Sequence, residues 1–530
     1  MKAFIFFILL FASVFGVFAQ SVEPEDPEIV LPEIALELES SQQETVETIV
    51  PDDVALFEPE LEPILPQAED LNISFDILDL PLLDQETPEV VQENSFYTEG
   101  TLGLGTTNRF LSDFTLYKFG MEPRFNIHFN HDILDGYNFG FNYRPAGEGF
   151  FKRNDLLEIQ LTYNDLGFKI ETDFDYLERE TGLQGFGDFY SIIRRKYSAD
   201  VLASFSAAKN LALEAKLDFD YMNFDLSSSE FSEGSELKAV PSFGAKLADD
   251  NGYFRSDVFY TLYYMVDALP LHGLKLLVDG GYEFNNGLGI AGSAGISWFY
   301  NSDILFPFDL TFKWVLSENA LISLKGGFSE SIPAFLEKSK EIPYLYSTAI
   351  PLREKEWFGQ LDGRFKISEL LTSDVFADFS YITDHNIPDF SAQDPATALF
   401  GMTGGNGIYL RAGLDTEWKL SEDLLLKVGW KSQVLPDLDP YFPAHELNFN
   451  ALFNTSDEKF KLKFNALWQI DERTNIPEIG LSLGYEIVDG VFLELDGADI
   501  LAPLYPEGRV KYGTFIEPGA SATIKTQISL

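Results

Sequence analysis

Cysteine is missing from this sequence of 530 residues, and only five histidines are present. A chain without cysteine forms no disulfide, so an exported protein of this kind depends on its secondary structure for stability. Positive charge is also scarce: 37 lysines and arginines stand against 85 aspartates and glutamates, a formal net charge of -48. That balance excludes a basic surface for nucleic acid, and it excludes recruitment to anionic lipid through a basic patch.

Long apolar runs are confined to the N-terminus, and none after it approaches the roughly 18 residues of a transmembrane helix. Lys2 is followed by an apolar run from Phe4 to Val17, and Val17-Phe18-Ala19 has the small-residue spacing of a signal-peptide cleavage site. We predict that residues 1–19 are a secretory signal peptide, cleaved after Ala19. An uncleaved anchor is the alternative.

Lysine and arginine are completely absent between Ser21 and Ser95, where aspartate, glutamate and proline recur. A segment of one charge sign with frequent proline cannot easily bury a core. We therefore expect residues 20–95 to form a largely disordered, acidic, Pro-rich arm in the periplasm. Its interspersed aliphatic residues, such as Ile29-Val30-Leu31, predict that residues 21–95 dock on a periplasmic protein partner. A solvated spacer is the alternative.

Residues 96–530 have a different pattern, in which short runs alternate apolar and polar side chains. Between Leu211 and Tyr221 every odd-numbered residue is apolar, and most even-numbered ones are charged. Residues 166–176 and 460–470 follow a similar pattern. A period of two is typical of a β-strand with two different faces. Because a soluble β-sandwich shows the same alternation, the pattern alone does not identify a membrane barrel.

Strand length and the connections between strands favour the barrel. The predicted strands have about 10 to 14 residues, whereas soluble strands average about 5 or 6 and a tilted bilayer crossing needs about 9 to 11. Short turns alternate with long loops, which is the arrangement of outer-membrane barrels with the short turns in the periplasm. The predicted turns are Asn164-Asp165, Lys209-Asn210, Asp249–Gly252, Asn285–Gly287, Ser317–Asn319, Ser421–Asp423, Ser456–Glu458 and Asp489-Gly490. The predicted loops are Leu177–Asp188, Ser227–Ser235, Ile332–Arg353, Asp384–Asn406, Leu435–Ala444 and Ala502–Thr514.

The tryptophans and the number of turns complete the fold prediction. All six tryptophans lie near predicted strand ends, as two aromatic girdles require: Trp298, Trp314, Trp357, Trp418, Trp430 and Trp468. Counting back from a last strand at Phe515–Leu530 gives an all-β, transmembrane antiparallel β-barrel of about 22 strands over residues 96–530. Its first strands are predicted at Phe96–Gly105, Phe110–Lys118 and Arg124–Leu134, followed by a surface loop at Asp135–Arg153. The other predicted starts lie near residues 155, 166, 189, 211, 236, 252, 271, 288, 304, 319, 354, 371, 407, 423, 445, 460, 476 and 491.

Catalytic and metal-binding patterns are not found, so we predict no catalytic, cofactor-binding or metal-binding residue and no enzyme. His128 and His131 are three residues apart, which places them on opposite faces of a strand and prevents them from sharing one metal ion. No nucleophile elbow or phosphate loop is present, and Gly401–Gly407 is interpreted as a flexible loop tip. His272 and His445 suggest no further site.

Two weaker groupings of polar residues do not predict a site either. Asp384 and His385 near Ser391 are better interpreted as polar loop residues than as hydrolytic groups. Asp437 and Asp439, between Pro436 and Pro440, lack the spacing of a calcium loop.

Charged residues on the polar strand faces are expected to line the lumen. Two interpretations remain open: a modest preference for cations, or cross-strand ion pairing within the barrel. The carboxylates are Asp173, Asp175, Asp218, Asp220 and Asp378, and the lysines are Lys169, Lys216, Lys461 and Lys463.

Several stretches also carry a family likeness. They are Ser323–Phe335, with Glu354–Trp357 and Gly363 after a Pro- and Tyr-containing loop; Val491–Leu501 with Pro518-Gly519; and the opening Gly100–Gly105. Together they resemble the barrel of the TonB-dependent receptors, and they cover most of residues 96–530. This resemblance implies a receptor-like barrel in the outer membrane of a diderm bacterium, surrounded by outer-membrane lipid.

The chain departs from that family in front of the barrel. The receptors carry a globular plug domain there, and the 75 residues from Ser21 to Ser95 are too few and lack its motifs. Glu44–Val50 matches a TonB box only weakly, and Leu530 stands where an aromatic residue is usual. We therefore expect a barrel without the N-terminal plug.

Two hypotheses for function follow. The first is a plug-less, receptor-like barrel that serves envelope transport as the membrane part of a larger system. The second is a structural or surface-interaction protein with extracellular binding loops and a periplasmic tether. Since lumen width grows with strand number, inward-folded loops, the arm or a separate partner protein should fill the barrel. The arm and the lumen are both acidic, so repulsion disfavours the arm inside the barrel.

Overall fold

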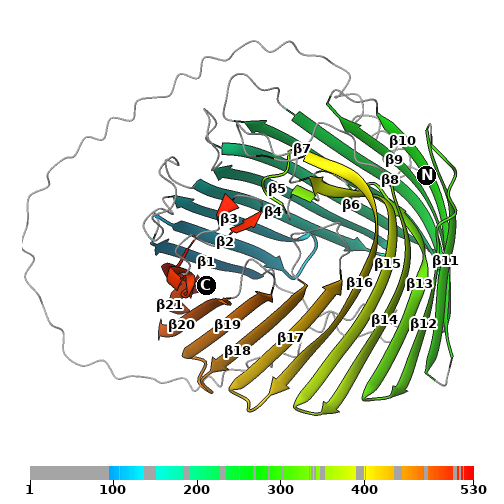
Figure 1. Ribbon diagram of the computed structural model, residues 1–530. Coiled ribbons are helices and arrows are strands. Elements are labelled where there is room, and N and C mark those ends of the chain that lie inside the picture. Colours follow the sequence, from blue (N-terminus) through cyan, green and yellow to red (C-terminus); the bar gives the residue numbers. More distant parts are fainter. Residues whose placement is uncertain are drawn as a thin grey trace, which may run out of the picture. The chain divides into compact units, whose positions relative to one another are not determined.

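A computed structural model of the protein (Figure 1) describes most residues between Ser95 and Ser529, all within one compact unit, Thr87–Leu530. The predictions of a signal peptide over residues 1–19 and of an arm over residues 20–95 lie outside the described residues, except that Ser95 belongs to the first strand. The described residues are 95–106, 108–135, 151–182, 191–226, 234–249, 251–266, 270–284, 287–300, 302–333, 335, 338–339, 342–346, 353–389, 399, 401–434, 444–470, 476–504, 510–512, 515–516 and 519–529.

The long strands form one 22-stranded antiparallel sheet, as predicted. They are β1 (Ser95–Gly105), β2 (Phe110–Phe119), β3 (Arg124–Asp135), β4 (Phe151–Asp165), β5 (Phe168–Gly182), β6 (Ser191–Ala208), β7 (Leu211–Leu226), β8 (Gly234–Ala248), β9 (Gly252–Met265), β10 (Leu271–Glu283), β11 (Leu288–Phe299), β12 (Phe308–Ser317), β13 (Ala320–Ser331), β14 (Glu354–Ser368), β15 (Leu371–Asp389), β16 (Gly401–Lys419), β17 (Leu424–Val434), β18 (His445–Asn454), β19 (Phe460–Ile470), β20 (Glu478–Val488), β21 (Val491–Ala498) and β24 (Ser521–Ser529).

The sheet closes on itself because the first strand pairs with the last. Each strand bonds to its neighbours in sequence, and β1 pairs with β24 from Glu99↔Ser529 to Gly105↔Thr523. Side chains reinforce the closure, since the amide of Gln527 donates a hydrogen bond to the Glu99 carboxylate. Closure removes the sheet edges, and every backbone group in the wall can then be paired inside a bilayer.

Most predicted strand starts agree with the structure to within a few residues, but the last strand was placed too early. β24 begins at Ser521, not at Phe515. The short strand β23 (Phe515–Ile516) instead pairs with β22 (Val510–Tyr512) in a separate two-stranded sheet. This hairpin belongs to the connection between β21 and β24, which also contains the 3₁₀ turn η3 (Ala502–Leu504).

The interpretation of Gly401–Gly407 as a flexible loop tip was wrong. These residues are the first part of β16 and pair with the end of β15, from Pro388↔Met402 to Ile382↔Gly407. The register shifts between Ile382 and His385, where Asp384 has a positive φ of 59°. One extra residue in β15 forms this β-bulge and changes which side chains point inward.

The outer face of the wall is apolar over the width of a bilayer. All six tryptophans are exposed, between 39% and 54%, together with many aliphatic and aromatic side chains. Trp298, Trp357, Trp430 and Trp468 lie toward the long-loop ends of their strands, whereas Trp314 and Trp418 lie toward the short-turn ends. The tryptophans therefore form two aromatic girdles, one toward each end of the strands, as predicted. Among the described residues, no helix is long and apolar enough to cross a membrane.

The wall differs in height around the barrel. β15 and β16 have 19 residues each and β6 has 18, whereas β21 has 8 and β24 has 9. A tilted crossing needs only about 9 to 11 residues, so the longest strands extend far beyond the bilayer on the side of the long loops. Figure 1 shows β14, β15 and β16 as the long curved side of the wall.

Candidate functional site: the barrel mouth

The inner face of the wall changes from charged to apolar toward the long-loop end. On β7 the inward positions begin with Glu214, Lys216, Asp218 and Asp220, and these charges suit a water-filled lumen. The next inward positions are Met222, Phe224 and Leu226, which are only 2%, 2% and 4% exposed. Apolar side chains that face a lumen are buried only if something folds over them.

A long surface loop provides this cover. We define the cap segment as residues 332–346, between β13 and β14; its described residues include the fully buried Phe335 and Leu345. They pack in one cluster with inward-facing side chains of β6, β7 and β9. The cluster, here called the mouth core, is Leu134, Ile192, Met222, Phe224, Leu226, Tyr263, Met265, Ile332, Phe335, Ile342, Tyr344, Leu345 and Leu399.

Aromatic contacts join the cap segment to strand β7. The Phe224 ring lies 5.4 Å from the ring of Phe335, and it meets the ring of Tyr346 edge-on at the same centroid distance. The Ser339 hydroxyl lies 4.0 Å from the sulfur of Met222. Aromatic pairs in such tilted and edge-on arrangements stabilise a contact beyond the area that they bury.

Hydrogen bonds fix the cap segment at two further points. The backbone N–H of Phe335 donates to the buried carboxylate of Glu236 on β8 at 2.8 Å, and the Tyr263 hydroxyl donates to the same carboxylate. The Arg194 guanidinium on β6 donates through Nη2 to the main-chain oxygen of Leu345 at 2.7 Å. The loop therefore folds into the mouth and is held there by both polar and apolar contacts.

An ion pair holds the two ends of the cap loop together. Arg353, just before β14, donates through Nε to Glu330 near the end of β13 at 2.6 Å. The same guanidinium donates to the Ser302 hydroxyl and the Asp303 main-chain oxygen, and it lies 4.7 Å above the Phe299 ring. Arg353 thus ties the base of the cap loop to the adjacent connection between β11 and β12.

The β-bulge in β15 builds a second buried polar group beside the mouth. Glu354 accepts hydrogen bonds from the His385 ring at 2.9 Å and from the Asn386 backbone at 2.8 Å. His385 is only 9% exposed, so its interpretation as a polar loop residue was wrong. Asp384 pairs with Lys355 instead, and Ser391 lies outside the described residues. The bulge turns His385 inward, toward a structural hydrogen bond with Glu354.

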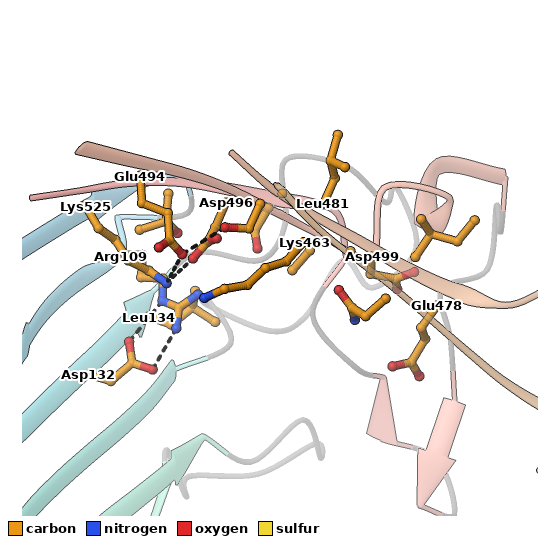
Figure 2. A pocket seen from close by; sticks show the side chains of 18 of the residues that line it. Arg109, Asp132, Leu134, Lys463, Glu478, Leu481, Glu494, Asp496, Asp499 and Lys525 are labelled. Atoms are coloured by element: carbon orange, nitrogen blue, oxygen red, sulfur yellow. Dashed lines mark hydrogen bonds and ion pairs between the residues drawn. The ribbon is translucent and has the colours of Figure 1, made fainter. Parts of the chain in front are cut away.

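A cavity of about 640 Å³ lies on the inner face beside the closure of the barrel (Figure 2). Arg109 binds the Asp132 carboxylate with both Nε and Nη2, at 3.0 and 2.9 Å. Lys525 on β24 forms ion pairs with Glu494 and Asp496 on β21. We call these five residues the seam cluster. It connects side chains from both sides of the β1–β24 junction, and none of them was identified from the sequence.

The lumenal charges predicted from the sequence are partly paired. Lys216 pairs with Asp218, Lys196 pairs with Asp220 at 3.0 Å, and Arg411 pairs with Asp378 at 3.0 Å. Lys463 lines the cavity of the seam cluster, while Lys169 pairs with Glu171. The Lys196–Asp220 and Arg411–Asp378 pairs join neighbouring strands, as one of the two interpretations of the lumen predicts, whereas Lys216–Asp218 and Lys169–Glu171 each lie within one strand.

The histidines on β3 have separate partners. His128 lies between Asp113 and Glu158, at 3.0 and 2.7 Å, while His131 pairs with Asp155. Within the described ranges, no group of three or more acidic or histidine side chains is arranged to hold a metal ion. Asp437 and Asp439 lie outside the described residues.

The closed sheet, the lipid-facing apolar belt and the loop folded into the mouth define a large β-barrel of the outer-membrane type. Among solved structures, the copper transporter OprC shares 12% identity over 84% of this chain and 81% of its own, with a TM-score of 0.60. The siderophore receptor PirA from Acinetobacter baumannii shares 8% over 84% and 81%, with a TM-score of 0.63. A variant of the ferric enterobactin receptor PfeA from Pseudomonas aeruginosa shares 9% over 83% and 80%, with a TM-score of 0.62.

At these identities the likeness shows the fold alone. It confirms, for the barrel, the resemblance to TonB-dependent receptors that the sequence suggested. Comparison with protein families and with curated proteins finds no match to this chain.

Proposed function

We propose that this protein is a transport barrel of the outer membrane whose lumen is gated from the outside by its own cap segment. The observation that carries the proposal is the insertion of Phe335 and Leu345, both fully buried, into the mouth core, where they pack against inward-facing side chains of β6, β7 and β9. A purely structural barrel has no need of an apolar inner face above a charged lumen. A gate needs that arrangement, because the loop must leave the wall and return to one fixed position.

The proposal also covers the periplasmic side of the barrel, where a plug domain or a partner protein would lie. The chain carries no plug domain of its own, and residues 21–95 bind a periplasmic protein that completes the transport system. Support comes from the composition of this segment, which has no lysine or arginine and too few residues for a plug. A basic or apolar partner surface suits such a segment best. The neighbouring structures named for copper and siderophore transport favour a small solute as cargo.

The gate can be tested by a reversible cross-link, because the natural chain has no cysteine. Met222 and Ser339 touch across the mouth, with their side-chain atoms 4.0 Å apart. In the double variant Met222→Cys, Ser339→Cys, a short bifunctional reagent that joins two thiols through reducible disulfides should bridge the gap left by the shorter side chains and lock the cap segment. Single-channel recording in planar bilayers should then show a loss of openings, and a reductant should restore them.

Each single-cysteine variant, treated with the same reagent, is the matched control and should behave as the natural chain does. The recordings are repeated on a variant that lacks residues 21–95, to separate gating by the cap from any effect of the arm. Bilayers that stay closed for the natural, reduced and truncated proteins alike would refute the transport proposal.

A surface-interaction role is the second candidate, favoured by the height of β15 and β16 above the membrane. In that case the cross-linked and the reduced double variant should both remain non-conducting, while binding to a neighbouring surface would depend on the tall side of the wall.

A further inference from the structure

The hairpin of β15 and β16 rises above β17 as a two-stranded ribbon. β16 pairs with β15 from Gly401 onward, whereas its pairing with β17 begins only at Leu410, which stands opposite Val434. Among the described residues, no strand pairs with the β17 side of β16 above that point. We call this stretch, Met402–Ile408, the open edge.

Two features of β15 show which backbone groups the open edge presents. The N–H of Asn386 donates to the Glu354 carboxylate on β14 at 2.8 Å, so it points away from β16. Asn386 stands opposite Gly404, and the two members of such an antiparallel pair both direct their N–H and C=O groups away from each other. Pro388, which has no N–H, stands opposite Met402 and fits the same pattern.

Backbone groups alternate between the two sides of a strand, so the even-numbered residues of β16 face the open edge. The parity also holds at the far end of β16, where the N–H of the odd-numbered Lys419 bonds on the β15 side. Within the described part of the chain, the N–H and C=O groups of four residues on this edge have no main-chain partner: Met402, Gly404, Asn406 and Ile408.

The sequence after β17 opposes an extension of that strand along the open edge. If β17 continued in register from Val434, Pro436 would stand opposite Ile408 and Pro440 opposite Gly404. Both positions require an N–H that donates to β16, and proline has none. The open edge is therefore left for a strand from elsewhere.

The open edge also lacks the usual protection of exposed strand edges, which is charge or proline. Gly401–Leu410 contains neither a charged residue nor a proline. The other edge of the ribbon differs, since it carries Pro388 and its Asn386 N–H is bonded to Glu354. On the open edge Gly404 and Asn406 are exposed to solvent. One side of the ribbon is thus protected and the other is accessible.

We propose that the open edge binds an extended segment of another polypeptide, which adds to the sheet as a strand above the end of β17. Alternating N–H and C=O groups match an extended peptide backbone, and the main-chain bonds supply the affinity. The net charge of -48 favours a segment with basic or uncharged side chains. Gly405 and Gly407 leave room for large side chains of the added strand. The inference goes beyond the proposed function and does not depend on the gate.

Binding can be tested with a short labelled peptide in which threonine and tyrosine alternate, with a lysine at each end. Fluorescence anisotropy with the purified full-length protein in detergent should show saturable binding. The same peptide with N-methyl groups on alternate residues keeps one hydrogen-bonding edge and should still bind. N-methylation of every residue leaves no donor on either edge and should weaken binding about tenfold or more. Glutamate in place of the two lysines should also weaken binding. Equal binding of all these peptides would refute strand addition.

Hydrogen exchange read at single residues locates the bound peptide in the natural protein. Without peptide, the amides of Gly404 and Asn406 should exchange fast, whereas those of Thr403 and Gly405, which face β15, should be protected. The peptide should slow exchange at Gly404 and Asn406 and leave Thr403 and Gly405 unchanged. Slow exchange at Gly404 and Asn406 before the peptide is added, or no change after it, would overturn the proposal.

A variant removes one donor of the open edge. Gly404→Pro lacks the N–H that faces this edge but keeps the pairing with β15, so it should weaken peptide binding about tenfold, because the ring also blocks close approach. Thr403→Val is the matched control; it changes an exposed side chain and no backbone group, and it should bind as the natural protein does. If Gly404→Pro does not fold, the methylated peptides decide the question on the natural protein.

A second copy of this chain is the rival occupant of the open edge. Light scattering of the peptide-free protein in detergent should show a monomer. A dimer in which Gly404 and Asn406 are already protected would assign the edge to self-association and would contradict the proposal.

Discussion

Truncating Phe335 should open the mouth without unfolding the barrel. Phe335 is fully buried, it lies 5.4 Å from the Phe224 ring, and its backbone N–H bonds to Glu236. In the variant Phe335→Ala the backbone bond remains, while the ring and its contacts disappear. Replacing a fully buried phenylalanine by alanine typically costs about 3–5 kcal/mol. The variant should destabilise the closed position of the cap segment and not the wall, because the 22 strands of the wall keep their own hydrogen bonds.

A free-energy cost of this size shifts the ratio of closed to open cap by roughly 10²- to 4 × 10³-fold, since each 1.4 kcal/mol is a factor of about ten. The first assay is the open probability of single channels, which should rise markedly. The second is hydrogen exchange of the cap amides, where protection of the Phe335 N–H should fall by a similar factor.

The control is Phe379→Ala on β15, which removes the same ring from the outer, lipid-facing side, where Phe379 is 46% exposed. It should leave both gating and cap protection unchanged. If Phe335→Ala left open probability and amide protection as they are in the natural protein, the cap segment would not be the gate, and our account of the mouth core would be wrong.

Three smaller changes should each affect one feature. Arg353→Ala removes the ion pair at the base of the cap loop and should raise open probability in recordings, but less than Phe335→Ala, because the mouth core stays intact. Lys525→Met leaves two seam carboxylates without their cation and should lower the free energy of unfolding, measured by denaturant titration, by roughly 1–3 kcal/mol. The control Lys427→Met breaks an exposed ion pair and should lower the same free energy by only about 0–1 kcal/mol. Hydrogen bonds from the Thr455 hydroxyl and from a backbone N–H lower the pKa of Asp457 in the exposed turn between β18 and β19. The turn should therefore keep full amide protection at neutral pH and lose it only as the pH falls through that lowered pKa; Asp457→Ala should abolish this pH dependence in hydrogen exchange.

The barrel wall was largely predictable because its signals are local. A strand that separates lipid from water must alternate, and β7 does so from Leu211 to Tyr221 with no contribution from the rest of the fold. Turn residues such as Asp489-Gly490 mark the ends of strands, and Gly490 has the positive φ of 73° that such a turn requires. Counting these turns was enough to give the number of strands.

The mouth was not predictable in the same way, because its contacts join distant parts of the chain. Phe335 and Glu236 are 99 residues apart, and Arg194 and Leu345 are 151 apart. One signal was present in the sequence and overlooked: Met222, Phe224 and Leu226 are apolar at positions whose parity makes them face the lumen. Such residues indicate that a loop folds inward, although they do not identify which loop.

The misplaced elements have related causes. The prediction of a flexible loop at Gly401–Gly407 rested on the preference of glycine for turns. It was wrong because backbone pairing with β15 determines the conformation of these residues. The seam cluster was not predicted from the sequence, because Arg109 and Lys525 come together only when the barrel closes. Alternation predicts which face a residue occupies, whereas the partner across the lumen or across the junction depends on closure of the whole sheet.

The unequal height of the wall gives the mouth a sloping rim. The 19 residues of β16 and the 9 of β24 differ by ten, a height difference of roughly 20 Å for strands tilted by about 45°. The low side of this rim lies beside the β1–β24 junction, where residues of β21, of β24 and of the connection between them line the cavity of the seam cluster.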